Sequence, residues 1–186
     1  MARFTAPDWL NLGMRQLAAH GADGLTIDHL CRAASRTRGS FYHHFESHDA
    51  FVERMMADWK SRHTIDVINT VDAIDDDLQR PRALSRLALN LDRNEEVAVR
   101  RFAQSNNQAA LVVDAVDTMR LAYLEKLHRA AGRLSITEAR QLAQLEYAAF
   151  IGTMVLWPRA PHSVLQGLEE AQAVMTRLFV EAKTRP

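Results

Sequence analysis

Helical periodicity, with almost no competing strand signal, is the feature that most constrains the fold of this chain. Apolar residues recur at intervals of three or four along most of its 186 residues, as in helices that bury one face. No run alternates apolar and polar residues cleanly, and only 7 glycines and 5 prolines interrupt the pattern. The sequence therefore predicts an all-α protein.

Three short helices are expected in the first forty-five residues. The first covers about residues 8–20 and is ended by the segment Gly21 to Gly24, because glycine is the usual left-handed terminator of a helix. Thr26 and Thr37 are suited to begin the second and third helices, since a threonine hydroxyl accepts a hydrogen bond from an otherwise unpaired backbone amide. The third helix is expected to end near His44.

Longer helices are expected in the remainder of the chain. Ser47 is placed to cap a fourth and longer helix with one buried face, and three further helices follow, the last of them ending at Gly132. Ser135 and Glu138 have the spacing of a capping box, in which a hydroxyl and a carboxylate satisfy each other's backbone amides. The last two helices are expected over residues 136–156 and 163–183, separated by Pro158.

Composition indicates an ordinary globular protein. Charged residues make up 25% of the chain, apolar residues 47%, and the formal net charge is zero. The single cysteine, Cys31, excludes an internal disulfide and favours the cytoplasm. The most apolar run, residues 148–157, is about half the roughly 20 residues that a membrane span needs, and we expect neither membrane insertion nor a signal peptide.

A histidine-rich stretch, TRGSFYHHFESH at residues 37–48, admits two interpretations. In the first, His43, His44 and His48 serve a metal-dependent helical bundle or an enzyme. His44 and His48 have the spacing of a zinc-binding pair, but Phe45 replaces the catalytic glutamate of that motif, and a helix start at Ser47 would separate them. No other catalytic motif occurs, so we expect no metal, no cofactor and no enzymatic activity.

In the second interpretation, the same stretch belongs to a helix-turn-helix, whose second helix lies in the major groove of DNA. Three arginines and no acid lie between residues 32 and 38. Arg38 is suited to phosphate or to a guanine edge. Gly39 either permits close approach to the duplex or relieves packing. Phe41 and Phe45, four apart, are expected to face inward, whereas Tyr42 and His43 face outward toward phosphate.

The segment Gly24 to Phe51, GLTIDHLCRAASRTRGSFYHHFESHDAF, strongly resembles the DNA-binding region of TetR-family transcriptional regulators. Its glycine, aromatic pair and closing phenylalanine sit at the family's spacing. The resemblance implies a helix-turn-helix domain at residues 1–47 and a helical regulatory and dimerisation domain at residues 48–186. It implies a core role for the residues Leu30, Cys31, Ala34, Phe41 and Phe45.

The chain departs from the family pattern at three positions. Ser35 stands where the turn usually has glycine, Arg36 where it usually has a small aliphatic residue, and His48 where a lysine is common. Arg36 is thereby free to reach DNA, and a phosphate contact from His48 would depend on pH. The residues expected to contact DNA are Thr26, Arg36, Thr37, Arg38, Gly39, Ser40, Tyr42, His43 and His48.

The C-terminal two thirds are too large to serve only as support for a fifty-residue DNA-binding domain. We expect them to bind a small-molecule effector and to hold two copies of the chain together on a near-palindromic double-stranded operator, as a repressor. Candidate effector-binding residues are Trp59, Phe102, Asn106, Tyr123, Phe150 and Met154. Candidate residues of the dimer interface are Leu142, Leu145, Ala149, Gly152, Leu168 and Met175.

Overall fold

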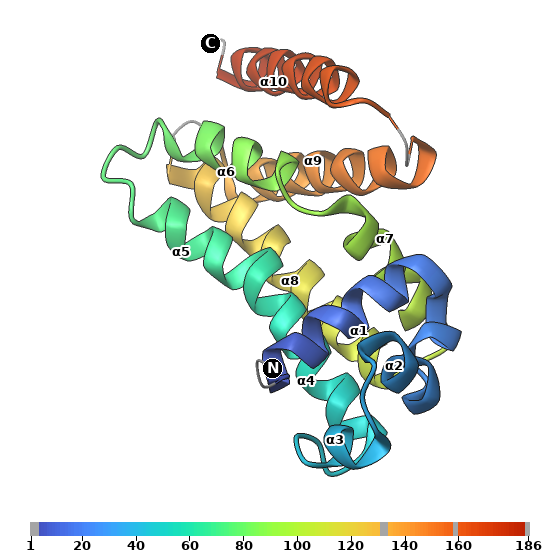
Figure 1. Cartoon of the computed structure of the whole chain (residues 1–186). Coiled ribbons are helices and arrows are strands. Elements are labelled where there is room, and N and C mark those ends of the chain that lie inside the picture. Colours follow the sequence, from blue (N-terminus) through green and yellow to red (C-terminus); the bar gives the residue numbers. More distant parts are fainter. Residues whose placement is uncertain (1–3, 131–133, 158–159, 185–186) are drawn as a thin grey trace. The chain divides into compact units, whose positions relative to one another are not determined.

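A computed structural model describes residues 4–130, 134–157 and 160–184. These residues form helices joined by turns and loops, with no strand among them, which confirms the predicted all-α class (Figure 1). Within the same ranges, no helix is long and apolar enough to cross a bilayer. The elements are α1 (Ala6–His20), η1 (Gly21–Leu25), α2 (Ile27–Ala34), α3 (Arg38–Tyr42), α4 (His48–Lys60), η2 (Ser61–Ile65), α5 (Asp66–Asp72), α6 (Arg80–Leu89), α7 (Arg93–Ala103), α8 (Asn107–Ala130), α9 (Ile136–Leu156) and α10 (His162–Thr184).

The chain divides into two compact units. The first combines the segment that ends at Arg62 with Asp92–Ala115, so α4, α7 and the beginning of α8 join the three N-terminal helices. Within it, α7 packs against α1 and η1. The second combines His63–Leu91 with the segment that begins at Val116.

The predicted caps determine where the N-terminal helices begin. The hydroxyls of Thr26, Thr37 and Ser47 each accept a hydrogen bond from the backbone N–H three residues further on, at 3.4, 3.2 and 3.0 Å. Helix α1 begins two residues earlier than predicted, because Thr5 and Asp8 form a capping box. At the other end of α1, Gly21 has φ 64° and ψ −153°, a conformation that glycine adopts readily but that differs from the left-handed helical conformation expected from the sequence.

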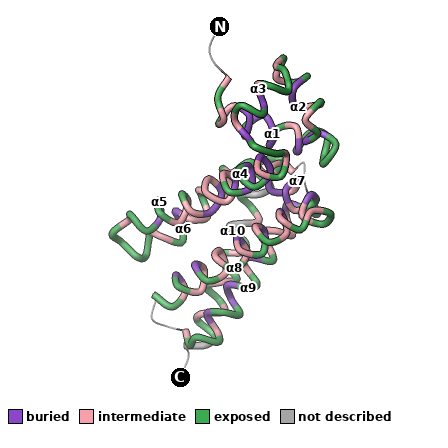
Figure 2. The backbone as a smooth tube through the Cα atoms, turned by 90° about the horizontal axis from the view of Figure 1, so that it is seen from below, coloured by how far each residue is buried: buried purple, intermediate pink, exposed green. Residues whose placement is uncertain are grey.

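An aromatic cluster forms the core of the first unit. Phe41 packs against Trp9, Phe45 and Phe51, with ring centroids 5.2–5.4 Å apart, and all four side chains are buried. Figure 2 colours the backbone by burial and shows buried segments along α1. The prediction that Phe41 and Phe45 face inward is therefore confirmed. Phe41 lies in α3, whereas Trp9 lies in α1 and Phe51 in α4. The cluster therefore holds the five-residue α3 against these longer helices.

The turn between α2 and α3 contains Ser35 in a left-handed conformation, with φ 51° and ψ 47°. It is the only residue other than glycine with a positive φ among those that the structure describes. The turn is closed by two backbone hydrogen bonds, from Ser35 N–H to the Arg32 carbonyl at 3.1 Å and from Arg36 N–H to the Cys31 carbonyl at 2.9 Å. Ser35 thus adopts the conformation for which the TetR family, which this segment resembles, more often uses glycine.

We predict that Ser35→Gly increases the free energy of unfolding by roughly 0.5–1 kcal/mol, because glycine adopts a positive φ without the steric penalty of a Cβ. Thermal and urea unfolding would measure the change. As a control, Ala33→Gly introduces glycine at an exposed helical position of α2 and should destabilise by about 1 kcal/mol. A Ser35→Gly variant less stable than the parent would contradict the prediction.

The predicted fourth helix extends through α4 and α5, but its hydrogen-bond pattern changes between them. The segment Ser61–Ile65 is a π-helical turn between α4 and α5, and the chain passes from the first unit to the second within it. In the second unit, Arg120 of α8 donates hydrogen bonds to the His63 carbonyl and the Thr64 hydroxyl, both at 3.1 Å. This contact joins residues more than fifty positions apart. The apolar periodicity of the fourth helix could therefore not predict it.

The second unit has a mixed core. Val71, Ala83, Tyr123 and Leu127 form an apolar cluster, and the Tyr123 hydroxyl donates to Asp72 at 2.8 Å. Ser135 and Glu138 form the predicted capping box at the start of α9. The predicted helix end at Gly132 and the helix breaker Pro158 lie outside the described residues.

Candidate nucleic-acid interface

Helices α2 and α3 form the helix-turn-helix, and α3 has one buried and one exposed side. Phe41 is fully buried, whereas its neighbour Tyr42 is 52% exposed. His43 is exposed too, as expected from the sequence. Of the other residues at this helix that are expected to contact DNA, the N-cap Thr37, Arg38 and Gly39 are exposed and Ser40 is half-buried. This helix therefore presents its polar residues outward together.

Gly39 is not required by packing within the chain. A Cβ built at this position would have the Thr37 hydroxyl as its nearest neighbour, at an ordinary contact distance of 3.7 Å. By contrast, a Cβ at Gly24 would collide with the backbone of Gln16. Of the two interpretations of Gly39, relief of packing thus finds no support, and close approach of another molecule to the start of α3 remains.

Three other predicted contact residues are engaged within the first unit. The Arg36 guanidinium lies over the Phe4 ring, 5.7 Å from its centroid, and donates to the Ser35 carbonyl at 3.2 Å. Thr26 caps α2 through its hydroxyl, although the residue is exposed. His48 Nε2 lies 3.0 Å from the carbonyl oxygen of Leu25.

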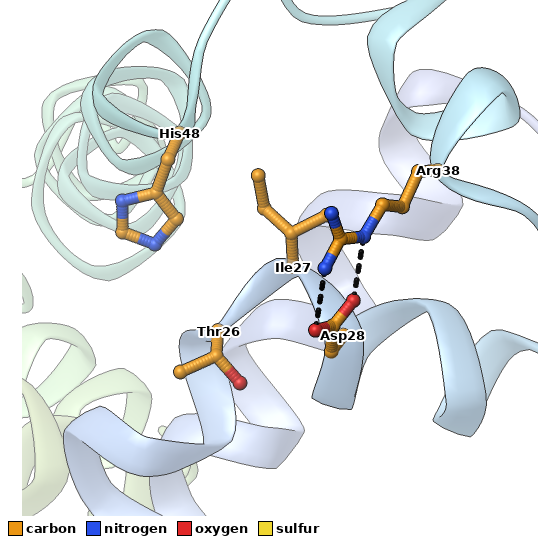
Figure 3. A pocket seen from close by; sticks show the side chains of 5 residues that line it. All are labelled: Thr26, Ile27, Asp28, Arg38 and His48. Carbon is orange, nitrogen blue, oxygen red and sulfur yellow. Dashed lines mark hydrogen bonds and ion pairs between the residues drawn. The ribbon is translucent and has the colours of Figure 1, made fainter.

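Arg38 is also paired, with a residue that the sequence had not singled out. Its Nε donates to Asp28 Oδ1 at 2.7 Å, and its Nη2 donates to Asp28 Oδ2 at 2.6 Å. This hydrogen bonding from Arg38 holds the pKa of the Asp28 carboxyl below its ordinary value. Both residues line an open hollow whose other walls are Thr26, Ile27 and His48 (Figure 3).

The histidines of this segment do not gather into a metal site. His44 Nε2 lies 3.0 Å from the Phe4 carbonyl, whereas His48 Nε2 lies 3.0 Å from the Leu25 carbonyl. A carbonyl oxygen only accepts, so each Nε2 carries a hydrogen and has no lone pair for a metal. Across the described ranges, no group of three or more His, Cys, Asp or Glu side chains is placed to hold a metal ion. The metal-dependent interpretation therefore has no geometric support.

The candidate effector-binding residues are divided between the two units. Trp59, Phe102 and Asn106 belong to the first, where both aromatic side chains are buried and Asn106 Oδ1 accepts from the Ala109 amide at 2.9 Å. The second unit holds Tyr123 and Met154, both buried, and Phe150, which stacks on Tyr147. None of the six lines the hollow beside Arg38.

The candidate dimer residues differ in exposure. Leu142 is buried within the second unit, whereas Leu145 and Met175 are 56% and 54% exposed. Ala149, Gly152 and Leu168 are half-buried. Thr176 of α10 donates a 2.6 Å hydrogen bond to Glu146 of α9. No side chain described in α10 is buried, although the helix carries several large apolar residues.

A helix-turn-helix joined to a larger set of helices defines a DNA-binding regulator, and comparison with known proteins specifies the family. Residues 10–55 match the sequence model for "Bacterial regulatory proteins, tetR family". In structure, the chain resembles the ketosteroid transcriptional regulator KstR2 of Mycobacterium tuberculosis, with a TM-score of 0.60 and 20% sequence identity over 97% of this chain and 95% of that one. No curated protein is a significant sequence match. The chain thus carries the N-terminal DNA-binding domain of TetR-family transcriptional regulators.

Proposed function

We propose that the protein is a ligand-responsive repressor that binds a near-palindromic operator as a homodimer. The main support for the proposal is that α3 has a buried and an exposed side. Phe41 is buried and anchors the helix, whereas Arg38, Tyr42 and His43 are exposed. A helix held in this way can enter the major groove without disturbing its own packing. Tyr42 and His43 would contact phosphate, and Arg38 would read a base edge.

Dimerisation is part of the proposal because one recognition helix reads only a few base pairs. Dimers of helix-turn-helix proteins place two such helices about 34–36 Å apart, one turn of DNA, which is why their operators are near-palindromic. The exposed apolar side chains of α9 and α10 are suited to hold the second copy. They include Leu145, Val155, Leu156, Val164, Val174, Met175 and Leu178.

Control by an effector would act on the equilibrium between two dimer geometries. A ligand shifts such an equilibrium only by the difference between its affinities for the two states. KstR2 is described as a ketosteroid transcriptional regulator. By analogy, an apolar effector about the size of a ketosteroid would suit the candidate residues Tyr123, Phe150 and Met154 in the second unit. The π-helical turn Ser61–Ile65, where the chain passes between the units, is our candidate for the element that responds.

The proposed function is tested by selecting bound sequences from a pool of random duplexes with the full-length protein. We expect an inverted repeat with half-sites about one helical turn apart. We also expect affinity to fall steeply as salt rises, because neutralised phosphates release counterions. Recovery of no inverted repeat would refute the palindromic operator, and binding without any sequence preference would refute the regulator itself.

A further inference from the structure

The pair formed by Asp28 and Arg38 joins the two helices of the helix-turn-helix at their exposed side. Asp28 lies in the first turn of α2 and Arg38 is the first residue of α3. Their side chains are 59% and 66% exposed, yet both carboxylate oxygens are engaged by the guanidinium (Figure 3). A bidentate pair of this kind sets the direction of the arginine as well as neutralising its charge.

The contact uses one edge of the guanidinium and leaves the other available. Asp28 accepts from Nε–H and from one N–H of Nη2. Of the five N–H donors of arginine, the two of Nη1 and the second of Nη2 remain. Arg38 makes no other side-chain hydrogen bond within the described part of the chain. The end of the guanidinium thus offers two parallel donors, which is the arrangement that guanine accepts at O6 and N7.

Stability gives only a modest reason for a carboxylate at this position, although Asp28 lies in the first turn of α2, where a negative charge favours the helix. Exposed ion pairs add little to folding, because water screens both charges and the side chains lose freedom. Near DNA, moreover, a negative charge is repelled by the phosphates and lowers affinity for every sequence alike. Asp28 would therefore weaken binding to all DNA sequences but orient the arginine that reads a base. Such a residue increases discrimination between sequences at the expense of affinity.

We propose that Asp28 is a positioning residue that holds the Nε and Nη2 edge of Arg38, so that the opposite edge reads a guanine in each operator half-site. This inference rests on the proposed function, because it requires a specific operator. It adds a residue of α2 to the determinants of specificity and assigns a base to Arg38. The rival possibility is that Asp28 masks Arg38, which DNA must then pull away.

The test measures binding of the full-length parent and its variants to the selected operator, to every single-base-pair change in one half-site, and to an unrelated duplex. The parent should prefer one G·C pair over its replacements by about tenfold or more, within the range for a bidentate contact. Asp28→Ala and the isosteric Asp28→Asn should reduce this preference to about threefold or less at that pair alone. Binding to the unrelated duplex should stay unchanged or tighten as the negative charge is lost.

Two controls separate positioning from other effects of the substitution. In an Arg38→Ala background, Asp28→Ala should no longer alter the preference, because the residue acts only through Arg38. Asp49→Ala removes an equally negative, exposed side chain from the first turn of α4. It should change general binding in the same direction as Asp28→Ala and leave base preference intact. Circular dichroism would verify that each variant keeps the fold of the parent.

The outcomes separate this inference from the proposed function. A parent that selects no specific duplex overturns both. A specific operator whose base preferences all survive Arg38→Ala overturns the inference alone. If Asp28→Ala and Asp28→Asn retain the full preference for guanine, Asp28 does not position Arg38. If they retain it and bind the operator more tightly, Asp28 masks Arg38 instead.

Discussion

Phe41→Ala is expected to lower the free energy of unfolding by about 3–5 kcal/mol and to abolish operator binding. Its ring is fully buried and contacts the rings of Trp9, Phe45 and Phe51, so truncation leaves a cavity lined by large, rigid side chains. Domains of this size are stable by only roughly 5–15 kcal/mol. Since α3 has five residues, little else retains it once this anchor is lost. Urea unfolding followed by tryptophan fluorescence would measure the loss.

The adjacent residue provides the matched control. Tyr42 is an aromatic residue of similar size on the same helix, but it is 52% exposed. Tyr42→Ala should change stability by about 0.5 kcal/mol or less, and it should weaken binding to most sequences similarly, as loss of a phosphate contact does. Equal destabilisation by the two substitutions would contradict the division of α3 into an anchoring and a DNA-facing side.

A single charge on α10, Leu178→Glu, is expected to split the dimer and to lower operator affinity by about 10²–10⁴-fold. Leu178 is 55% exposed, so glutamate costs little within one chain. In an interface of obligate type, which commonly buries about 2,000 Å² or more, a glutamate from each copy would be buried without a partner for its charge. The two recognition helices would then bind independently, which removes the gain from linking them.

Light scattering at micromolar concentration would report the oligomeric state of parent and variant. Leu111→Glu is the matched control, because Leu111 is an exposed leucine on α8, outside the apolar residues of α9 and α10. It should leave both the dimer and operator binding unchanged. A monomeric parent would refute the arrangement, and a Leu178→Glu variant that stays dimeric would move the interface away from α10.

The sequence by itself determined the helices and the side of α3 that faces the core. Threonine and serine caps at Thr26, Thr37 and Ser47 act within three residues, and so they could be identified without knowledge of the fold. The inward positions of Phe41 and Phe45 follow from helical spacing, which is equally local. The family resemblance rested on the same short segment.

Only the tertiary structure decided which polar groups meet. Asp28 and Arg38 are ten residues apart on different helices, and His44 and His48 are bound to the carbonyls of Phe4 and Leu25 rather than to each other. No spacing rule predicts such pairs, because they depend on the angle at which packed helices cross. The π-helical turn at Ser61–Ile65, which Arg120 of α8 contacts, could not be predicted for the same reason. Apolar periodicity indicates which face a helix buries, but the position at which its hydrogen-bond pattern changes depends on long-range packing.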